Sequence, residues 1–154
     1  MKPKQLYGLF SVGEAITWGL LITALVLRAV GNPVPEAIVI AGSSHGAMFL
    51  AYCTTAVLVG VNQRWKFGKI AISVFLAIIP FATIPWDRRL VKTESLSGAW
   101  RTGASADPRD SHWFDQLFRW FIARPMLLIV VLITFVALLF VVLLSLGSPT
   151  TWGR

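Results

Sequence analysis

The chain has 154 residues, of which 56% are hydrophobic and 14% are charged, and its net charge is +7. Soluble domains carry about 25% charged residues, so this composition excludes an ordinary soluble domain and indicates that lipid is the main solvent. The positive charge comes without a basic helix or an aromatic and basic platform, so we expect contacts with anionic lipids and no nucleic-acid partner.

Four apolar runs predict four transmembrane helices, because each is close to the roughly 20 residues that cross a hydrocarbon layer. Helices are expected since backbone groups cannot bond to lipid, and the runs lack the alternation of barrel strands. The predicted fold class is therefore all-α, a polytopic membrane protein. No cleavage site follows the first run, so a retained signal anchor is expected. The four runs cover residues 6–30, 36–61, 67–86 and 125–147.

The links between the first three runs are short. Residues 31–35 combine Gly, Asn and Pro and predict a tight turn, so the first two helices should form an antiparallel hairpin. Pro80 and Pro85 should bend the end of the third helix or stop it, because proline lacks a backbone N–H.

The polar segment before the last run has two parts. Residues 88–110 are rich in Ser, Gly and charge, and they indicate a surface loop. Residues 111–123 carry large apolar side chains at helical spacing and predict a short amphipathic helix before Pro125. Either the headgroup region or a partner protein would cover these side chains, and the sequence leaves both open. The predicted contact residues are Trp113, Phe114, Leu117, Phe118 and Phe121.

Together these elements predict three parts. They are a three-helix membrane core over residues 1–87, a polar loop with an interfacial helix over 88–124, and a C-terminal transmembrane helix with its tail over 125–154. Six tryptophans, Trp152 among them, mostly lie near predicted helix ends, as interfacial anchors do.

Orientation depends on basic residues, because cytoplasmic loops are enriched in Lys and Arg. Four spans would place six basic residues on the side of the termini and eight on the side of the long loop. The raw count favours the long loop inside. However, the first helix often dominates the orientation, and the turn that follows it carries only Arg28. We therefore expect both termini in the cytoplasm and the chain in the bacterial plasma (inner) membrane.

Glu14 is the most informative polar residue, since it lies roughly 12 Å along the first span, where a carboxylate is costly. Ser11, Thr17 and Trp18 share its helix face and extend a polar stripe. The favoured interpretation is a buried carboxyl that bonds a neighbouring helix. The alternative is a proton carrier or a ligand contact.

His45 lies in the second span between small residues. Gly42 and Gly46 form a pair at i and i+4 that permits another helix to approach closely. Antiparallel helices bring His45 to a depth similar to that of Glu14, so a hydrogen bond between them is geometrically possible. The pair is interpreted first as a packing contact and second as a site for protons or a ligand.

No cofactor is expected. Bis-histidine haem needs a second intramembrane histidine, and the other histidine, His112, lies in the polar segment. No cluster has metal-ligand spacing, so no metal site is predicted. No nucleophile-elbow, Walker or dinucleotide motif is present, so we expect no enzyme. Cys53 lies within an apolar run, so we expect it to act as a small, buried apolar residue.

Several short motifs resemble those of the YdzA-like family of small bacterial, mainly actinobacterial, integral membrane proteins. The motifs are Glu14-Ala15-Ile16-Thr17-Trp18, His45-Gly46 with Phe49 and Tyr52, and Pro80 with Pro85-Trp86-Asp87. The resemblance covers about residues 6–87 and implies a membrane fold without an established reaction.

We therefore expect a non-catalytic accessory subunit, or an assembly or stability factor, of a larger bacterial membrane complex. A respiratory cytochrome bc–oxidase supercomplex is the kind of complex considered first, and its integral membrane subunits are the expected partners. The alternative is a small proton-linked transporter or channel built on the intramembrane pair Glu14 and His45.

Overall fold

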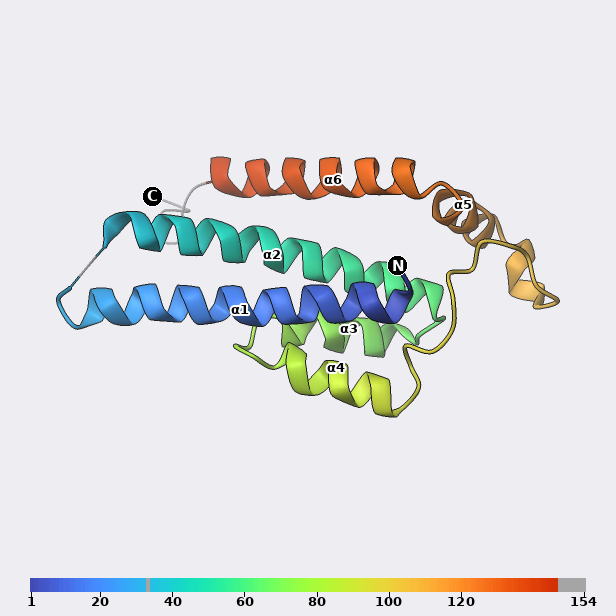
Figure 1. Cartoon of the computed structure of the whole chain (residues 1–154). Helices are drawn as coiled ribbons and strands as arrows, with labels where there is room; N and C mark the ends of the chain where they lie inside the picture. The colour runs from blue at the N-terminus through green and yellow to red at the C-terminus, as the bar shows by residue number, and fades with distance from the viewer. Residues whose placement is uncertain (33, 147–154) are drawn as a thin grey trace. The chain divides into compact units, whose positions relative to one another are not determined.

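The computed structural model describes residues 1–32 and 34–146, and all regular structure within them is helical (Figure 1). The expected tail with Trp152, and Pro33 of the first turn, lie outside the described residues. The chain divides into two compact units, residues 1–98 (unit 1) and residues 99–154 (unit 2), and each is described by itself. An all-α membrane protein with several spans is thus confirmed.

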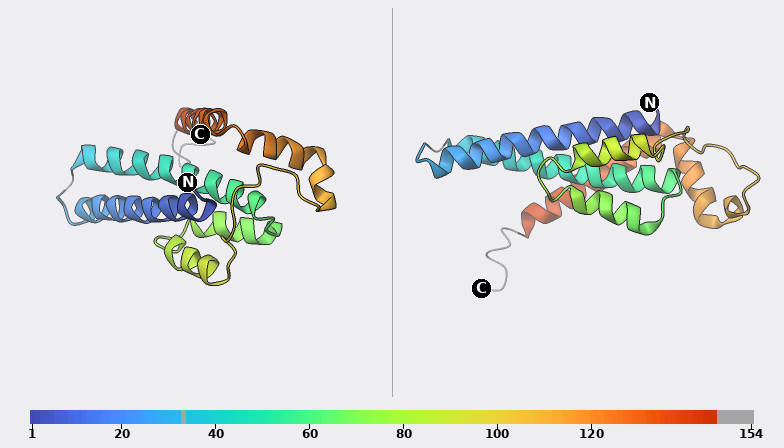
Figure 2. Two further views of the ribbon diagram at one scale, coloured as in Figure 1. Left: turned by 45° about the vertical axis from the view of Figure 1, so that its right-hand side comes forward. Right: turned by 90° about the horizontal axis from the view of Figure 1, so that it is seen from below.

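Unit 1 is built on two long antiparallel helices, α1 (Pro3–Ala29) and α2 (Pro35–Asn62), which lie side by side (Figures 1 and 2). Their 27 and 28 residues make each about 40 Å long, enough to cross a membrane. Each begins with a proline at its first turn, where the missing N–H would have no partner in any case. The predicted first hairpin is confirmed.

The third apolar run differs from its prediction as one span. It forms two short helices, α3 (Phe67–Leu76) and α4 (Thr83–Lys92), joined by a turn. Pro80 supplies the reason, because it has no N–H for the carbonyl of Leu76. The last N–H groups before Pro80 bond three residues back, as in Ile79 to Leu76 at 3.2 Å. Phe81 then takes a left-handed φ of 62° and reverses the chain.

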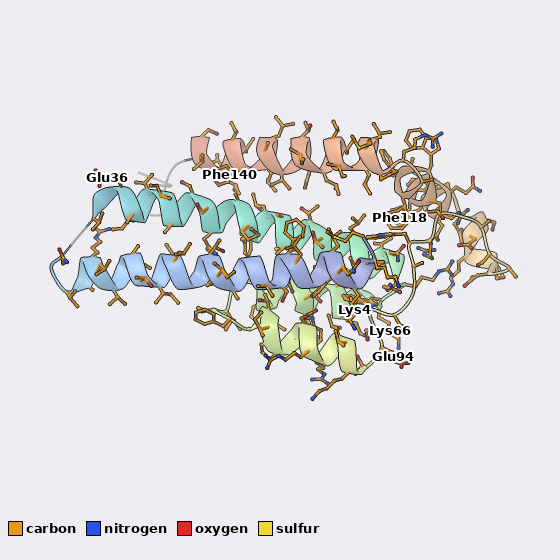
Figure 3. The ribbon with its side chains drawn as sticks, in the orientation of Figure 1. Lys4, Glu36, Lys66, Glu94, Phe118 and Phe140 are labelled. Atoms are coloured by element: carbon orange, nitrogen blue, oxygen red, sulfur yellow. The ribbon has the colours of Figure 1, made fainter. Side chains whose placement is uncertain are left out.

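The hairpin of α3 and α4 returns to the edge of unit 1 at which it began. The Trp65 indole, just before α3, donates to the backbone oxygen of Ser95, just after α4, at 2.9 Å. Lys4, Lys66 and Glu94 accordingly lie together at one end of unit 1, whereas Glu36 lies at the other (Figure 3). Unit 1 extends beyond the predicted core of residues 1–87 because α4 continues to Lys92.

Three described helices, in place of four, are long and apolar enough to cross a membrane: α1, α2 and α6. The α3 helix spans 10 residues, or about 15 Å, so it reaches only part of the way across a hydrocarbon layer of about 30 Å. The turn at its tip is apolar and exposed, with Ile78 57% and Phe81 48% exposed. The hairpin therefore consists of a short apolar helix, an exposed apolar turn and the charged helix α4.

Unit 2 contains a 3-10 turn, η1 (Pro108–Ser111), and two helices, α5 (Trp113–Ile122) and α6 (Pro125–Ser145). The predicted short helix over residues 111–123 is confirmed as α5. The α6 helix carries Leu, Ile, Val and Phe on every side, and none of its residues is buried within the chain.

The crossing of α2 and α3 gives a direct test of this packing. A Cβ added to Gly60 would lie 2.6 Å from Cγ1 of Ile70 and 3.2 Å from the Trp65 ring. Gly60→Ala should therefore destabilise unit 1 by about 1–3 kcal/mol through overpacking, measured as a lower unfolding temperature in detergent. Gly68→Ala, which meets nothing within 4 Å, is the control and should be neutral or slightly stabilising. Equal stability of the two variants would contradict the close crossing.

Candidate functional site in the helical core

One face of α1 carries a buried polar stripe. Tyr7, Ser11, Glu14 and Thr17 recur at intervals of three or four residues, which places them on one side of the helix. Thr17 is 8% exposed, and the other three side chains are fully buried. The buried stripe around Glu14 thus includes Ser11 and Thr17 and extends back to Tyr7, whereas Trp18 is only partly buried.

The stripe is bonded by the first residue of α4. The Ser11 hydroxyl donates to the backbone oxygen of Thr83 at 3.0 Å. The Thr83 hydroxyl lies 3.2 Å from both Oε2 of Glu14 and the backbone oxygen of Ser11. Glu14 therefore bonds a neighbouring segment, as the favoured interpretation expected, but this segment is α4.

The second carboxylate oxygen of Glu14 has no such partner. Oε1 is buried and accepts no hydrogen bond from any described residue. A buried oxygen without a donor is unfavourable, because its lost hydration is not replaced. This atom is the feature of the site that packing does not explain.

His45 does not bond Glu14 in the described structure. Its Nδ1 lies 3.2 Å from the hydroxyl of Thr17, which donates to the backbone oxygen of Glu14 at 2.9 Å. The tautomer of His45 decides which of the two groups donates in this contact. The imidazole also packs on the Trp18 ring at 4.3 Å. Thr17 thus connects the two predicted residues without a direct bond.

A second polar cluster lies nearer the start of α1. The hydroxyls of Tyr7 and Tyr52 are 2.8 Å apart and both side chains are fully buried. The Trp86 indole donates to the hydroxyl of Ser73 at 2.8 Å. The sequence predicted neither Tyr7 nor Ser73 as a site residue. The available signal for Tyr7 is its helical spacing of four residues from Ser11.

The outer face of α2 has a different character. Ser43 and Ser44 are exposed, and Gly42 has nothing within 4 Å of an added Cβ. Eight residues of helix, or about 12 Å, separate Pro35 from Ser43, so these small and polar groups lie well inside the span. The described part of unit 1 therefore brings no helix against Gly42. Within residues 1–32 and 34–146, no three His, Cys, Asp or Glu side chains form a metal-binding group.

Asp87 on α4 provides a pH-dependent test of the core. Burial raises the pKa of its carboxyl, and the Lys4 ammonium offsets part of the rise. The folded chain then holds this proton more tightly than the unfolded chain does. Stability from this group is therefore highest at low pH and decreases as the pH rises from the ordinary aspartate pKa toward the raised one.

Asp87→Asn should remove that decrease and raise the unfolding temperature at neutral pH. The measurement is thermal unfolding in detergent between about pH 3 and about pH 8. A native protein whose stability does not fall across this acid range, or an Asn variant with the same profile, would contradict the buried carboxyl.

Comparisons with known proteins agree with a membrane protein. Residues 4–92 match the model of the family described as domain of unknown function DUF3817. The chain is 35% identical over 80 residues to a Streptomyces coelicolor protein named "Putative membrane protein SCO5905". That match covers 49% of this chain but only 9% of the relative. No solved structure matches. The expected resemblance to small membrane proteins of unknown function is confirmed, and the chain belongs to the DUF3817 family.

Proposed function

We propose that this chain is a non-catalytic subunit or assembly factor of a larger membrane complex, and that α2 binds a helix of a partner subunit. The observation that carries the proposal is the exposure of Ser43 and Ser44 beside the open Gly42, well inside the span. Lipid offers no hydrogen bonds to such hydroxyls and packs poorly on a glycine. A partner helix provides both contacts.

The neighbouring turn of α2 shows the contrast. Val39 and Ile40 are 67% and 65% exposed, and their branched apolar side chains suit lipid. One turn later the exposed residues become small and polar. The change of chemistry along one helix favours a local protein contact over a lipid-facing surface throughout.

The relatives also support a component rather than a free-standing protein. The stretch matched in Streptomyces coelicolor makes up only 9% of a much longer polypeptide. A core of this kind therefore occurs as one part of something larger. We propose that its partners are other integral membrane subunits, such as those of a respiratory oxidase. Isolation of the complex would identify the partner subunits.

Affinity purification from the native membrane in mild detergent tests the proposal. Ser43→Leu with Ser44→Leu should reduce the partner recovered about tenfold, since close helix contacts of this type contribute about 1–2 kcal/mol. Val39→Leu with Ile40→Leu is the matched control and should retain the partner. Purification of the native chain without a stoichiometric partner would contradict the subunit role.

The returning hairpin also leads us to propose a topology. If α1, α2 and α6 cross and α3 and α4 return, the chain reaches α6 on the side where α1 began. That side then holds 12 of the 14 lysines and arginines, whereas Arg28 lies at the other end of α1. This asymmetry supports a cytoplasmic N-terminus, and the proposed topology differs from the expectation that both termini share one side.

Fusions to the two ends of the full chain in a bacterial plasma membrane check this topology. A fluorescent protein that folds only in the cytoplasm should be bright at the N-terminus and dark at the C-terminus. Alkaline phosphatase, which is active only outside, should show the opposite pattern. A bright C-terminal fluorescent fusion would restore four crossings.

A second candidate function, proton-linked transport, is favoured by the bare Oε1 of Glu14 within the buried stripe. A carboxyl with one free oxygen can exchange a proton without breaking its bond to Thr83. Glu14→Gln should then abolish proton flux into liposomes that contain the purified protein and a pH-sensitive dye. Thr23→Val, which loses only a bond to Gly19 on the exposed side, should leave it unchanged. Equal flux with Glu14→Gln would exclude this role.

A further inference from the structure

The α5 helix of unit 2 is amphipathic in an unusual sense, because its charges point into the unit. Asp115 and Arg119 are only 19% and 11% exposed at their side chains. Four of its large apolar residues are exposed: Trp113 at 74%, Phe114 at 48%, Leu117 at 46% and Trp120 at 44%. Phe118 and Phe121, which were predicted as contact residues with them, are only partly exposed. The four exposed residues are called the aromatic face.

Asp110, which is 5% exposed, holds the charges inward. Its Oδ1 lies 3.0 Å from Arg119 and 3.4 Å from Arg101. Its Oδ2 accepts from the backbone N–H and the hydroxyl of Ser105 at 2.7 and 2.6 Å. Arg119 also donates to the backbone oxygen of Asp110 at 2.7 Å. One buried carboxylate thus connects the loop, η1 and α5.

Arg101 completes the inner side of α5. It pairs with Asp115 at 2.8 Å and its guanidinium lies 5.5 Å from the ring centre of Phe118. The inner side of α5 is therefore neutralised and covered by the chain itself. The aromatic face has no such cover within unit 2.

The position of α5 in the chain identifies what covers that face. Only Ala123 and Arg124 separate its last residue from Pro125, where α6 begins. Two residues span at most about 7 Å. Because α6 is a 21-residue apolar span, its start lies at the boundary of the hydrocarbon layer, and α5 must lie close to that boundary.

Arg124 fits the same location. Its guanidinium stacks 4.1 Å from the ring centre of Trp120 and donates to the backbone oxygen of Trp120 at 3.2 Å. In the described part of the chain it makes no ion pair with a carboxylate. Trp and Arg side by side at the end of a span are typical of the headgroup layer, where a ring is half-buried and a guanidinium meets phosphate.

We infer that the aromatic face of α5 is a membrane-binding surface that lies in the headgroup layer, with Arg124 against lipid phosphate. Asp110 is a positioning residue, because it turns Asp115 and Arg119 away from the lipid and fixes the direction of the face. This inference is independent of the partner proposed for α2. Of the two covers that the sequence left open for these side chains, headgroups and a partner protein, it favours the headgroups.

Spin labels on the purified full chain in phosphatidylcholine and phosphatidylglycerol liposomes test it. In a Cys53→Ala background, labels are placed at Leu117→Cys on the aromatic face, at Gly103→Cys in the loop and at Val130→Cys on α6. A Cβ added to Gly103 would meet no atom within 4 Å, and Val130 is 58% exposed, so both positions tolerate a label. Collision with oxygen reports lipid, and collision with a water-soluble nickel chelate reports water.

The collision rates of the label at Leu117 with oxygen and with the nickel chelate should lie between those of the other two labels. They should correspond to the depth of the lipid phosphates. Asp110→Asn should shift them toward the rates of the label at Gly103, whereas Asp107→Asn, in a more exposed ion pair with Arg109, should not. If, with Asp110 unchanged, the label at Leu117 collides with the nickel chelate as often as the label at Gly103 does, the inference is overturned. Low collision with both reagents would also overturn it, because protein would then cover the face.

Discussion

The structure of unit 1 depends on one constraint, which is that polar groups in a lipid-facing bundle need hydrogen-bond partners from protein, since lipid tails supply none. Glu14 and Ser11 on α1 meet this constraint through Thr83, the first residue of α4. That contact holds the tip of the returning hairpin against α1. The same contact explains why α4 packs beside α1. The α4 helix is too highly charged to cross a membrane, whereas α1 is long and apolar enough to do so.

The long helices could be predicted because their signal is simple. Runs of more than 20 apolar residues identify α1, α2 and α6, and helical spacing of aromatic residues identifies α5. The hairpin of α3 and α4 could not, since hydropathy over residues 67–86 does not distinguish one span from a short helix and an apolar turn. Pro80 was the available signal, and its effect on the carbonyl of Leu76 determines where α3 ends.

The site was predicted in part for a related reason. Depth along antiparallel helices suggested a contact between Glu14 and His45, and in the structure Thr17 bonds both His45 and the backbone oxygen of Glu14. Depth alone does not give the direction of a side chain around its helix, so the bond of Glu14 to Thr83 was missed. Tyr7 was missed, and Tyr52 was noted only as part of a motif, because a buried tyrosine cannot be told from an apolar residue in the sequence until the partner of its hydroxyl is known.

Two proposed surfaces follow from these arrangements, the small residues of α2 on unit 1 and the aromatic face of α5 on unit 2. The inner polar stripe bonds unit 1 together, whereas the small residues of α2 face outward. The most direct test of the proposed subunit role is a photoreactive amino acid at Ser44 of the chain, activated in its native membrane. The account predicts a crosslink to a second polypeptide, with the same group at Ile40 crosslinking mainly lipid. Crosslinks to lipid at both positions would contradict it.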